Sequence, residues 1–209
     1  GDRGFSVPGC RPATGVTRRA AKKTKVSGIC FSGFAFWVPS EPDPGPYFCI
    51  NISMNKEIQY LVSTLQNTLF GEPWYGRSVY SLLEEADPPT VYIRPNEYGH
   101  SQIDLLYHMI TWSEFTLKRI EGEKIDDMEA FDQLDWREID PTEHTWEKGL
   151  EQFKQIHEQM IELLHTKDDQ FLDQKVDYRE YNFRYLINGL IQHNIYHVGQ
   201  VVTVGKLVK

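Results

Sequence analysis

Apolar residues recur every three or four positions in four long segments of this chain, and this spacing constrains its fold more than any other feature. In the first segment, one helical face collects Ile58, Leu61, Val62, Leu65 and Leu69. The same period recurs in three later segments, at 101–123, 145–165 and about 178–206. Such a period predicts amphipathic helices, and no alternating run of β-branched residues interrupts them. The sequence therefore predicts an all-α fold, a four-helix bundle.

Residues that start and end helices flank these segments. Ser101 is placed to cap the start of the second helix, and Gly122 is placed to end it. The stretch "GEPWYG" at 71–76 stops the first helix, and a short helical turn is predicted at 78–87. Apolar residues lie on more than one side of the second helix, so we expect other elements to cover several of its faces.

Residues 1–53 differ in composition from the rest of the chain. They hold seven Lys/Arg against three Asp/Glu, whereas residues 54–209 hold 15 against 27. All three Cys lie in this first segment, and all seven His lie beyond it. The sequence thus predicts an irregular, poorly structured N-terminal extension before a bundle domain at 54–209. Because Met54 opens the patterned part, we also hypothesise that the extension is not native, which peptides from before Met54 in natively expressed protein would refute.

Charge and cysteine content narrow the possible partners. The acidic, cysteine-free body cannot form a disulfide framework, which favours a cytoplasmic location. It has no basic stripe for nucleic acid, and no run reaches the roughly 18 apolar residues of a membrane span. Segment 26–38 follows the basic cluster 18–25 in the order of a signal peptide, but no small-x-small cleavage site follows it. We therefore expect neither a nucleic acid nor a membrane as partner.

Two histidines interrupt the apolar face of the last predicted helix. His193 and His197 lie one turn apart in the stripe that Leu190 and Val201 continue. A buried neutral imidazole needs a partner for both its donor and its acceptor. Core hydroxyls or backbone carbonyls can supply these partners, but two rings one turn apart can instead bind one metal ion. The pairing favours a metal, and a third ligand would decide between the two interpretations.

His108 is the best candidate for that third ligand. It lies in the second predicted helix, and Asp104, one turn before it, could orient its ring. Three neutral imidazoles leave at least one coordination position open, which is typical of a reactive rather than a structural metal site. Trp74, Trp112 and Tyr196 are candidates for the lining of a pocket. The sequence assigns no residue a catalytic role.

Other His-containing sites fit the sequence less well. A zinc protease of the HExxH type needs Glu at the position of Asn194. A di-iron bundle needs two helical Glu-x-x-His motifs. Of the two matches, "EYGH" at 97–100 contains a glycine and precedes its helix, and "ELLH" at 162–165 places its His at the edge of the apolar face. His157 is expected to bond a backbone group rather than a metal.

Four segments of the chain resemble the DinB/YfiT-like superfamily of metal-dependent enzymes: "GEPWYGRSVYSLLE", "HSQIDLLYHMITWSEFTLKRIEG", "DWREI" and "LINGLIQHNIYHVGQ". The resemblance runs from Met54 to the C-terminus, and the last segment is the most specific. It implies an up-down-down-up four-helix bundle, often a homodimer. The extension at 1–53 has no counterpart in the family pattern. The ending at 201–209 is rich in Val and contains Gly and Thr, which predicts a frayed last turn.

The resemblance also implies a cofactor and a range of activities. The cofactor is a divalent metal, usually nickel or zinc, held by His108, His193 and His197. Characterised members include transferases and isomerases that use bacillithiol or mycothiol, and some hydrolases. We therefore expect a metal-dependent hydrolase or thiol-dependent transferase that acts on a small molecule. The alternatives are a non-catalytic metal-containing binding or stress-response module and a purely structural bundle with core histidines.

Overall fold

We obtained a computed structural model of the chain, which describes residues 55–124 and 128–209. The prediction of an irregular extension at 1–53 lies outside these residues. Within them no strand forms, and the helices are α1 (Lys56–Phe70), α2 (Val79–Leu83), α3 (Gln102–Glu121), α4 (Met128–Asp135), α5 (Trp146–Leu164), α6 (Asp169–Asp173) and α7 (Phe183–Leu207). None of these helices combines the length and the apolar character that a membrane crossing requires.

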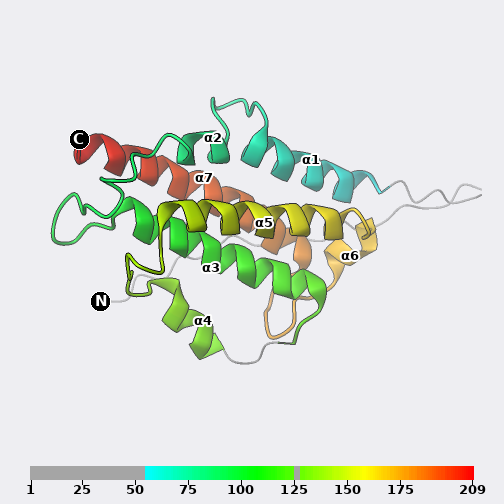
Figure 1. The fold of residues 1–209 in the computed structure, drawn as a ribbon. Coiled ribbons are helices and arrows are strands. Elements are labelled where there is room, and N and C mark those ends of the chain that lie inside the picture. Colours follow the sequence, from blue (N-terminus) through cyan, green and yellow to red (C-terminus); the bar gives the residue numbers. More distant parts are fainter. Residues whose placement is uncertain (1–54, 125–127) are drawn as a thin grey trace, which may run out of the picture. The chain divides into compact units, whose positions relative to one another are not determined.

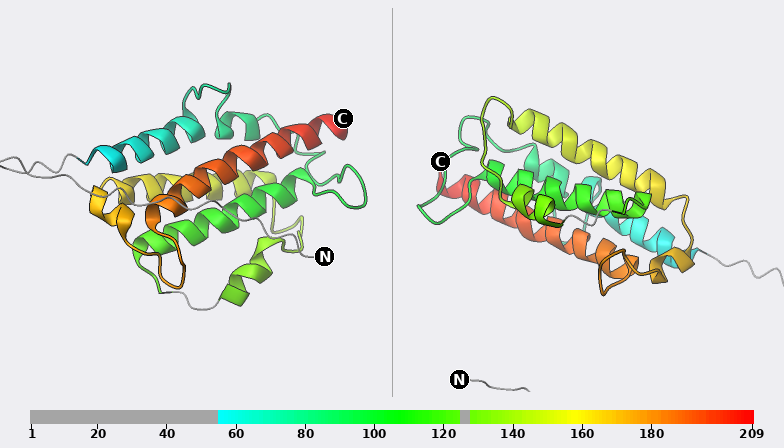
Figure 2. Two further views of the ribbon diagram at one scale, coloured as in Figure 1. Left: turned by 180° about the vertical axis from the view of Figure 1, so that it is seen from behind. Right: turned by 90° about the horizontal axis from the view of Figure 1, so that it is seen from below.

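The four long helices α1, α3, α5 and α7 pack side by side (Figure 1). α1 and α7 run in one direction, and α3 and α5 run in the other, as Figure 2 also shows. This is the up-down-down-up arrangement that the family resemblance implies. Because α3 and α5 are parallel neighbours, the chain must return along the bundle between them, and α4 lies on this return.

α3 is the most covered of the long helices. Of its 20 residues, 16 are buried, because α4, α5 and α7 all pack against it. Its ends are those that the sequence predicts. Ser101 and Asp104 exchange hydrogen bonds in a capping box at its start, and Gly122 adopts the left-handed conformation, with φ of 85°, at its end.

α5 approaches α3 closely at Gly149. A Cβ atom at this position would lie 2.8 Å from Cδ2 of Leu106, so a larger residue here would require the Leu106 side chain to shift. The approach brings His157 of α5 against Ser113 of α3 and Asn194 of α7 in the middle of the core. The interior of the bundle is therefore apolar with a small polar group at its centre.

Three features of the helices differ from the sequence-based expectation. The segments that form α4 and α6 were expected as connections, and α7 begins at Phe183, after the cap Asn182, rather than near residue 178. The predicted fraying of the last turn is also wrong, because α7 continues to Leu207. Nε2 of Gln102 donates to the carbonyl of Val201 at 3.1 Å, and the missing side chain of Gly205 leaves room for Gln102.

Candidate metal centre

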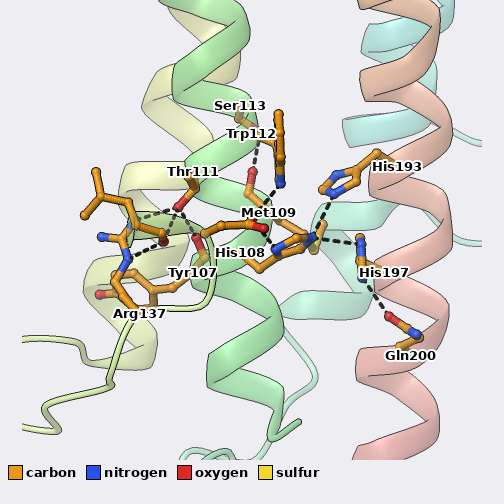
Figure 3. Close-up of polar contacts among 12 residues, drawn as sticks. Tyr107, His108, Met109, Thr111, Trp112, Ser113, Arg137, His193, His197 and Gln200 are labelled. Atoms are coloured by element: carbon orange, nitrogen blue, oxygen red, sulfur yellow. Dashed lines mark hydrogen bonds and ion pairs between the residues drawn. The ribbon is translucent and has the colours of Figure 1, made fainter. Parts of the chain in front are cut away.

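Three imidazoles converge between α3 and α7 (Figure 3). His108 comes from the second turn of α3, and His193 and His197 come from successive turns of α7. Nε2 of His108 lies 3.0 Å from Nε2 of His193 and 3.1 Å from Nε2 of His197. One nitrogen from each ring lies within 4.8 Å of the other two. The structure thus brings together the three histidines that the sequence singles out.

The alignment of α3 with α7 explains why these rings meet. The two helices are antiparallel, and the hydrogen bond from Gln102 to the carbonyl of Val201 fixes their register. His108 lies six residues after Gln102 in α3, and His197 lies four residues before Val201 in α7. His193 is one further turn back. The i,i+4 spacing then presents both α7 rings to the α3 ring.

Burial keeps the three rings neutral. His108 and His197 are 6% and 7% exposed, and His193 is half-buried. Burial lowers the pKa of His193 to about 3, with the neighbouring His197 and His108 acting in the same direction. Burial likewise lowers the pKa of His197 to about 4, and it lowers the pKa of His108 against the opposing effect of Asp135. Neutral imidazoles are the form that binds metal ions.

The outer nitrogens of two rings have acceptor partners. Nδ1 of His108 lies 2.7 Å from Oδ1 of Asp135, and Nδ1 of His197 lies 2.6 Å from Oε1 of Gln200. Because a carboxylate and an amide oxygen only accept, each of these Nδ1 atoms carries the ring proton. Nε2 of His108 and Nε2 of His197 are therefore both unprotonated, and the two atoms lie 3.1 Å apart.

This arrangement fits a divalent cation. Two unprotonated nitrogens at 3.1 Å cannot form a hydrogen bond with each other, so their lone pairs repel unless a cation lies between them. Ring nitrogens bind zinc at about 2.0–2.1 Å, so two ligands of one ion lie about 3 Å apart. The observed separations of 3.0 and 3.1 Å match this requirement. The three-His group can therefore hold a metal ion.

Two residues at the end of α4 hold the His108 ring from outside. Asp135, besides its contact with His108, accepts a hydrogen bond from Nε1 of Trp112 at 2.7 Å. The indole of Trp136 stacks between the rings of His108 and His100, at centroid distances of 3.9 and 3.8 Å. The carboxylate thus fixes the proton position of His108, and the indole fixes the plane of its ring.

Asp104 does not take the role that its spacing suggests. Its carboxylate accepts from the backbone N–H of Ser101 at 2.9 Å and pairs with Arg94 at 3.2 Å. A carboxylate three residues after the cap is in reach of the free N–H groups at the helix start, and this bond holds it away from His108. Asp135 performs the orienting role instead. Sequence reasoning missed it, and its one signal was the "DWREI" segment of the family resemblance.

The three predicted pocket residues differ in their placement. Trp112 contacts the centre through Asp135 and packs near His193, with ring centroids 6.3 Å apart. Tyr196 packs on His197 at 4.8 Å, and its hydroxyl accepts from Nε2 of Gln200 at 3.2 Å. Trp74 lies elsewhere, because the turn between α1 and α2 leaves its side chain fully exposed.

The remaining histidines do not join the centre. His157 is fully buried, and its Nδ1 lies 2.8 Å from the carbonyl of Phe153, which confirms the prediction of a backbone partner. Its Nε2 lies 3.1 Å from Nδ2 of Asn194, and burial lowers its pKa to about 4. His100 and His165, from the two Glu-x-x-His matches, are both exposed, so the described residues do not assemble a di-iron site from them.

Comparison with known proteins places this centre in a family. Residues 76–201, well over half of the chain, match the DinB superfamily model. The matched span includes all three histidines together with Asp135 and Trp136. No curated protein and no solved structure matches the chain. From the matched span we conclude that the chain belongs to the DinB superfamily.

Proposed function

We propose that this protein is a metal-dependent enzyme acting on small molecules, and that a thiol-dependent transferase reaction suits its centre best. The observation that carries the proposal is the convergence of three imidazoles, in which Nε2 of His108 lies 3.0 Å from Nε2 of His193 and 3.1 Å from Nε2 of His197. A divalent cation bound there, for which nickel and zinc are the candidates, would lower the pKa of a thiol or a water at an open position.

The chain's own groups favour a thiol over water. Hydrolysis gains from a group that accepts a proton from the attacking water, and a carboxylate is the common choice. Among the residues that the structure describes, Asp135 is the carboxylate that contacts the cluster. It lies at Nδ1 of His108, on the side of the ring away from Nε2. A free thiol has a pKa of about 8.5 and loses its proton on metal binding without such a base.

The proposed reaction needs a small thiol and an electrophilic acceptor. The sulfur forms a bond to the electrophilic atom, the leaving group departs with its bonding electrons, and the thiol proton passes to solvent. His108, His193 and His197 bind the cation in this scheme. Asp135 and Gln200 keep the protons at Nδ1 of His108 and His197, so that the Nε2 atoms stay available.

Elemental analysis and a substrate screen test the proposal. Protein purified without added metal is expected to contain close to one equivalent of divalent metal, and a panel of low-molecular-weight thiols with electrophilic acceptors is expected to show turnover. His197→Ala should abolish both. Activity that persists in His197→Ala would contradict the metal mechanism, and stoichiometric metal without any turnover would indicate a non-catalytic metal-containing module instead.

Three expectations remain predictions: nickel or zinc as the metal and a homodimer, which the family resemblance implies, and a cytoplasmic location, which the cysteine-free body favours. Elemental analysis identifies the metal, sedimentation velocity measures the oligomeric state, and fractionation of cells measures the location. A monomer in solution would contradict the second expectation without affecting the metal centre.

A further inference from the structure

We infer that a surface cavity beside His193 binds an uncharged, apolar part of the electrophilic substrate. The inference rests on the proposed function and specifies the substrate class for the same centre. The cavity has a volume of about 280 Å³ and lies in the groove between α3 and α7. Its walls include Trp112, Thr116, Tyr181, Tyr185, Gly189 and His193.

The position of His193 connects this cavity to the metal centre. Among the three ligands, His193 is half-buried, whereas His108 and His197 are almost fully buried. The His193 ring therefore lies between the cluster and the cavity, and it is the ring over which a small molecule can approach. Trp112 also connects the cavity with the metal centre, because its indole lines the cavity and donates a hydrogen bond to Asp135.

The chemistry of the cavity wall selects for an uncharged group. No Asp, Glu, Lys or Arg lines it, and its accessible surface is mostly carbon. The hydroxyl of Thr116 donates to the carbonyl of Trp112 at 2.9 Å, so it is already paired. A charged group would lose hydration here without gaining a counter-charge, whereas an aromatic ring can pack on the Trp112 and Tyr185 rings. Since a cavity of about 150 Å³ holds benzene, this one has room for a two-ring compound.

A second cavity in the same groove provides a control. It has a volume of about 390 Å³, it is also mostly apolar, and its lining includes His100, Tyr196, Gly199 and Gln200. None of the three ligands lines it, and Gln200 contacts His197 at Nδ1, on the side away from the cluster. Binding that depends on the metal centre should therefore use the first cavity and not the second.

Two glycines of α7 allow each cavity to be filled separately. Gly189 lines the first cavity and Gly199 lines the second. A Cβ atom added at either position meets no atom within 4 Å, so a larger side chain enters open space. Leucine is also a better helix former than glycine. Gly189→Leu and Gly199→Leu are therefore both expected to fold, and they differ in which cavity they fill.

Isothermal titration calorimetry of the full chain with its bound metal tests the inference, with 2-naphthol as the uncharged probe and 2-naphthalenesulfonate as the anionic one. We expect 2-naphthol to bind the unmodified protein and Gly199→Leu with similar Kd, and Gly189→Leu at least ten-fold more weakly. We expect the sulfonate to bind the unmodified protein at least ten-fold more weakly than 2-naphthol. An unchanged Kd for 2-naphthol in Gly189→Leu, equal losses in both variants, or equal affinity for the two probes would overturn the inference.

The readout separates this inference from the proposed function. Selective binding of 2-naphthol without turnover of any acceptor would contradict the proposed function and leave the apolar site standing. Turnover of acceptors that is unchanged by Gly189→Leu would uphold the function and overturn the site. A second copy of the chain is the other possible occupant of the cavity. A change in oligomeric state of Gly189→Leu, measured by sedimentation velocity, would assign the cavity to that interface and overturn the inference.

Discussion

The proton positions of the imidazoles decide what the centre can bind. Asp135 lies at ion-pair distance from Nδ1 of His108, and Gln200 accepts from Nδ1 of His197, which favours both Nε2 atoms as acceptors. Without these two partners, each ring could place its proton on Nε2, and one ring could then donate to the other. The pair of acceptors outside the cluster therefore makes the difference between a metal site and a hydrogen-bonded group of histidines.

Replacing the carboxylate that contacts His108 should weaken metal binding. Asp135→Asn removes the negative charge that holds the proton on Nδ1, and we expect metal affinity to fall about 10–100-fold. Competition with a chromophoric chelator measures this affinity. Asp104→Asn is the matched control, because its carboxylate caps α3 and pairs with Arg94 without contacting His108. Equal losses of affinity in the two variants would show that the effect comes from α3 rather than from the His108 contact.

His157 should make the stability of the metal-free protein depend on pH. Its pKa is about 4 in the folded protein, below the ordinary value of 6.5, because it is fully buried. Between pH 6.5 and pH 4 the unfolded chain binds a proton that the folded chain does not, so the free energy of unfolding falls as pH falls, by up to about 3 kcal/mol. Above pH 6.5 this effect is absent.

Urea unfolding at pH 7 and pH 5, in the presence of a chelator, measures this dependence. His157→Gln should show a smaller loss of stability between the two pH values than the unmodified protein. His165→Gln replaces an exposed histidine and should leave the loss unchanged. The same pH dependence in His157→Gln as in the unmodified protein would refute the assignment to His157.

Single residues also show how far the sequence could predict the centre. His108, His193 and His197 could be found because helical spacing places them on apolar faces. Asp135 could not, because the contact joins residues 27 positions apart, and local spacing favoured Asp104 instead. Only the folded arrangement of α4 on α3 brings the carboxylate to the ring.

α4 is the element that supplies this arrangement. Its end is fixed to α3 by Thr111, whose hydroxyl lies 3.0 Å from the carbonyls of both Tyr107 and Leu134 (Figure 3). Arg137 strengthens the attachment, because its guanidinium donates to Oγ1 of Thr111 at 2.6 Å and to the Leu134 carbonyl at 3.1 Å. These bonds hold Leu134 against α3 and so place Asp135, which follows Leu134, beside His108.

Loss of this attachment should affect the metal site without changing any group that touches it. Thr111→Val keeps the size of the side chain but removes the hydroxyl, which leaves the Arg137 donor and the Leu134 carbonyl each without one partner. We expect the free energy of unfolding to fall by about 1–3 kcal/mol and metal affinity to fall several-fold. Thr203→Val is the control, because its hydroxyl bonds only within α7, to the carbonyl of Gly199. Unchanged metal affinity in Thr111→Val would show that α4 holds its position by other contacts.

The long helices and the short α2 could be predicted from the sequence, whereas α4 and α6 could not. α3 has apolar residues over five turns and a cap at each end, so its boundaries follow from Ser101 and Gly122. α4 is eight residues long, so the helical spacing of its apolar residues Met128, Phe131 and Leu134 spans only about two turns, and Phe131 is its one buried residue. Its helical state depends on packing against α3, which is information that its own residues do not carry.

On the scale of the whole bundle, the centre joins α3 and α7. The histidines that meet there are separated by 85 or 89 positions in the sequence. A cation held by α3 and α7 binds only the folded state, so it should stabilise the protein by mass action. At a free metal concentration of 100 times Kd this stabilisation is about 2.7 kcal/mol.

Removal of the metal should therefore lower the melting temperature by about 5–10 °C, given about 2–4 °C per kcal/mol for a domain of this size. Differential scanning calorimetry with and without a strong chelator measures the shift, and elemental analysis verifies that the metal is gone. His197→Ala should show no shift, because it lacks a ligand. A verified metal-free protein that melts at the same temperature as the metal-bound one would contradict the bridge between the helices.

The parallel course of α3 and α5 has a consequence for how this protein can vary. The chain that runs back between them is a requirement of the topology, and it is also the piece that carries Asp135 and Trp136. The three histidines thus lie on the long helices, while the two residues that contact the His108 ring lie on the connecting segment. Changes of sequence in that connector can alter the contacts made to His108 and leave both the three histidines and the packing of the long helices intact.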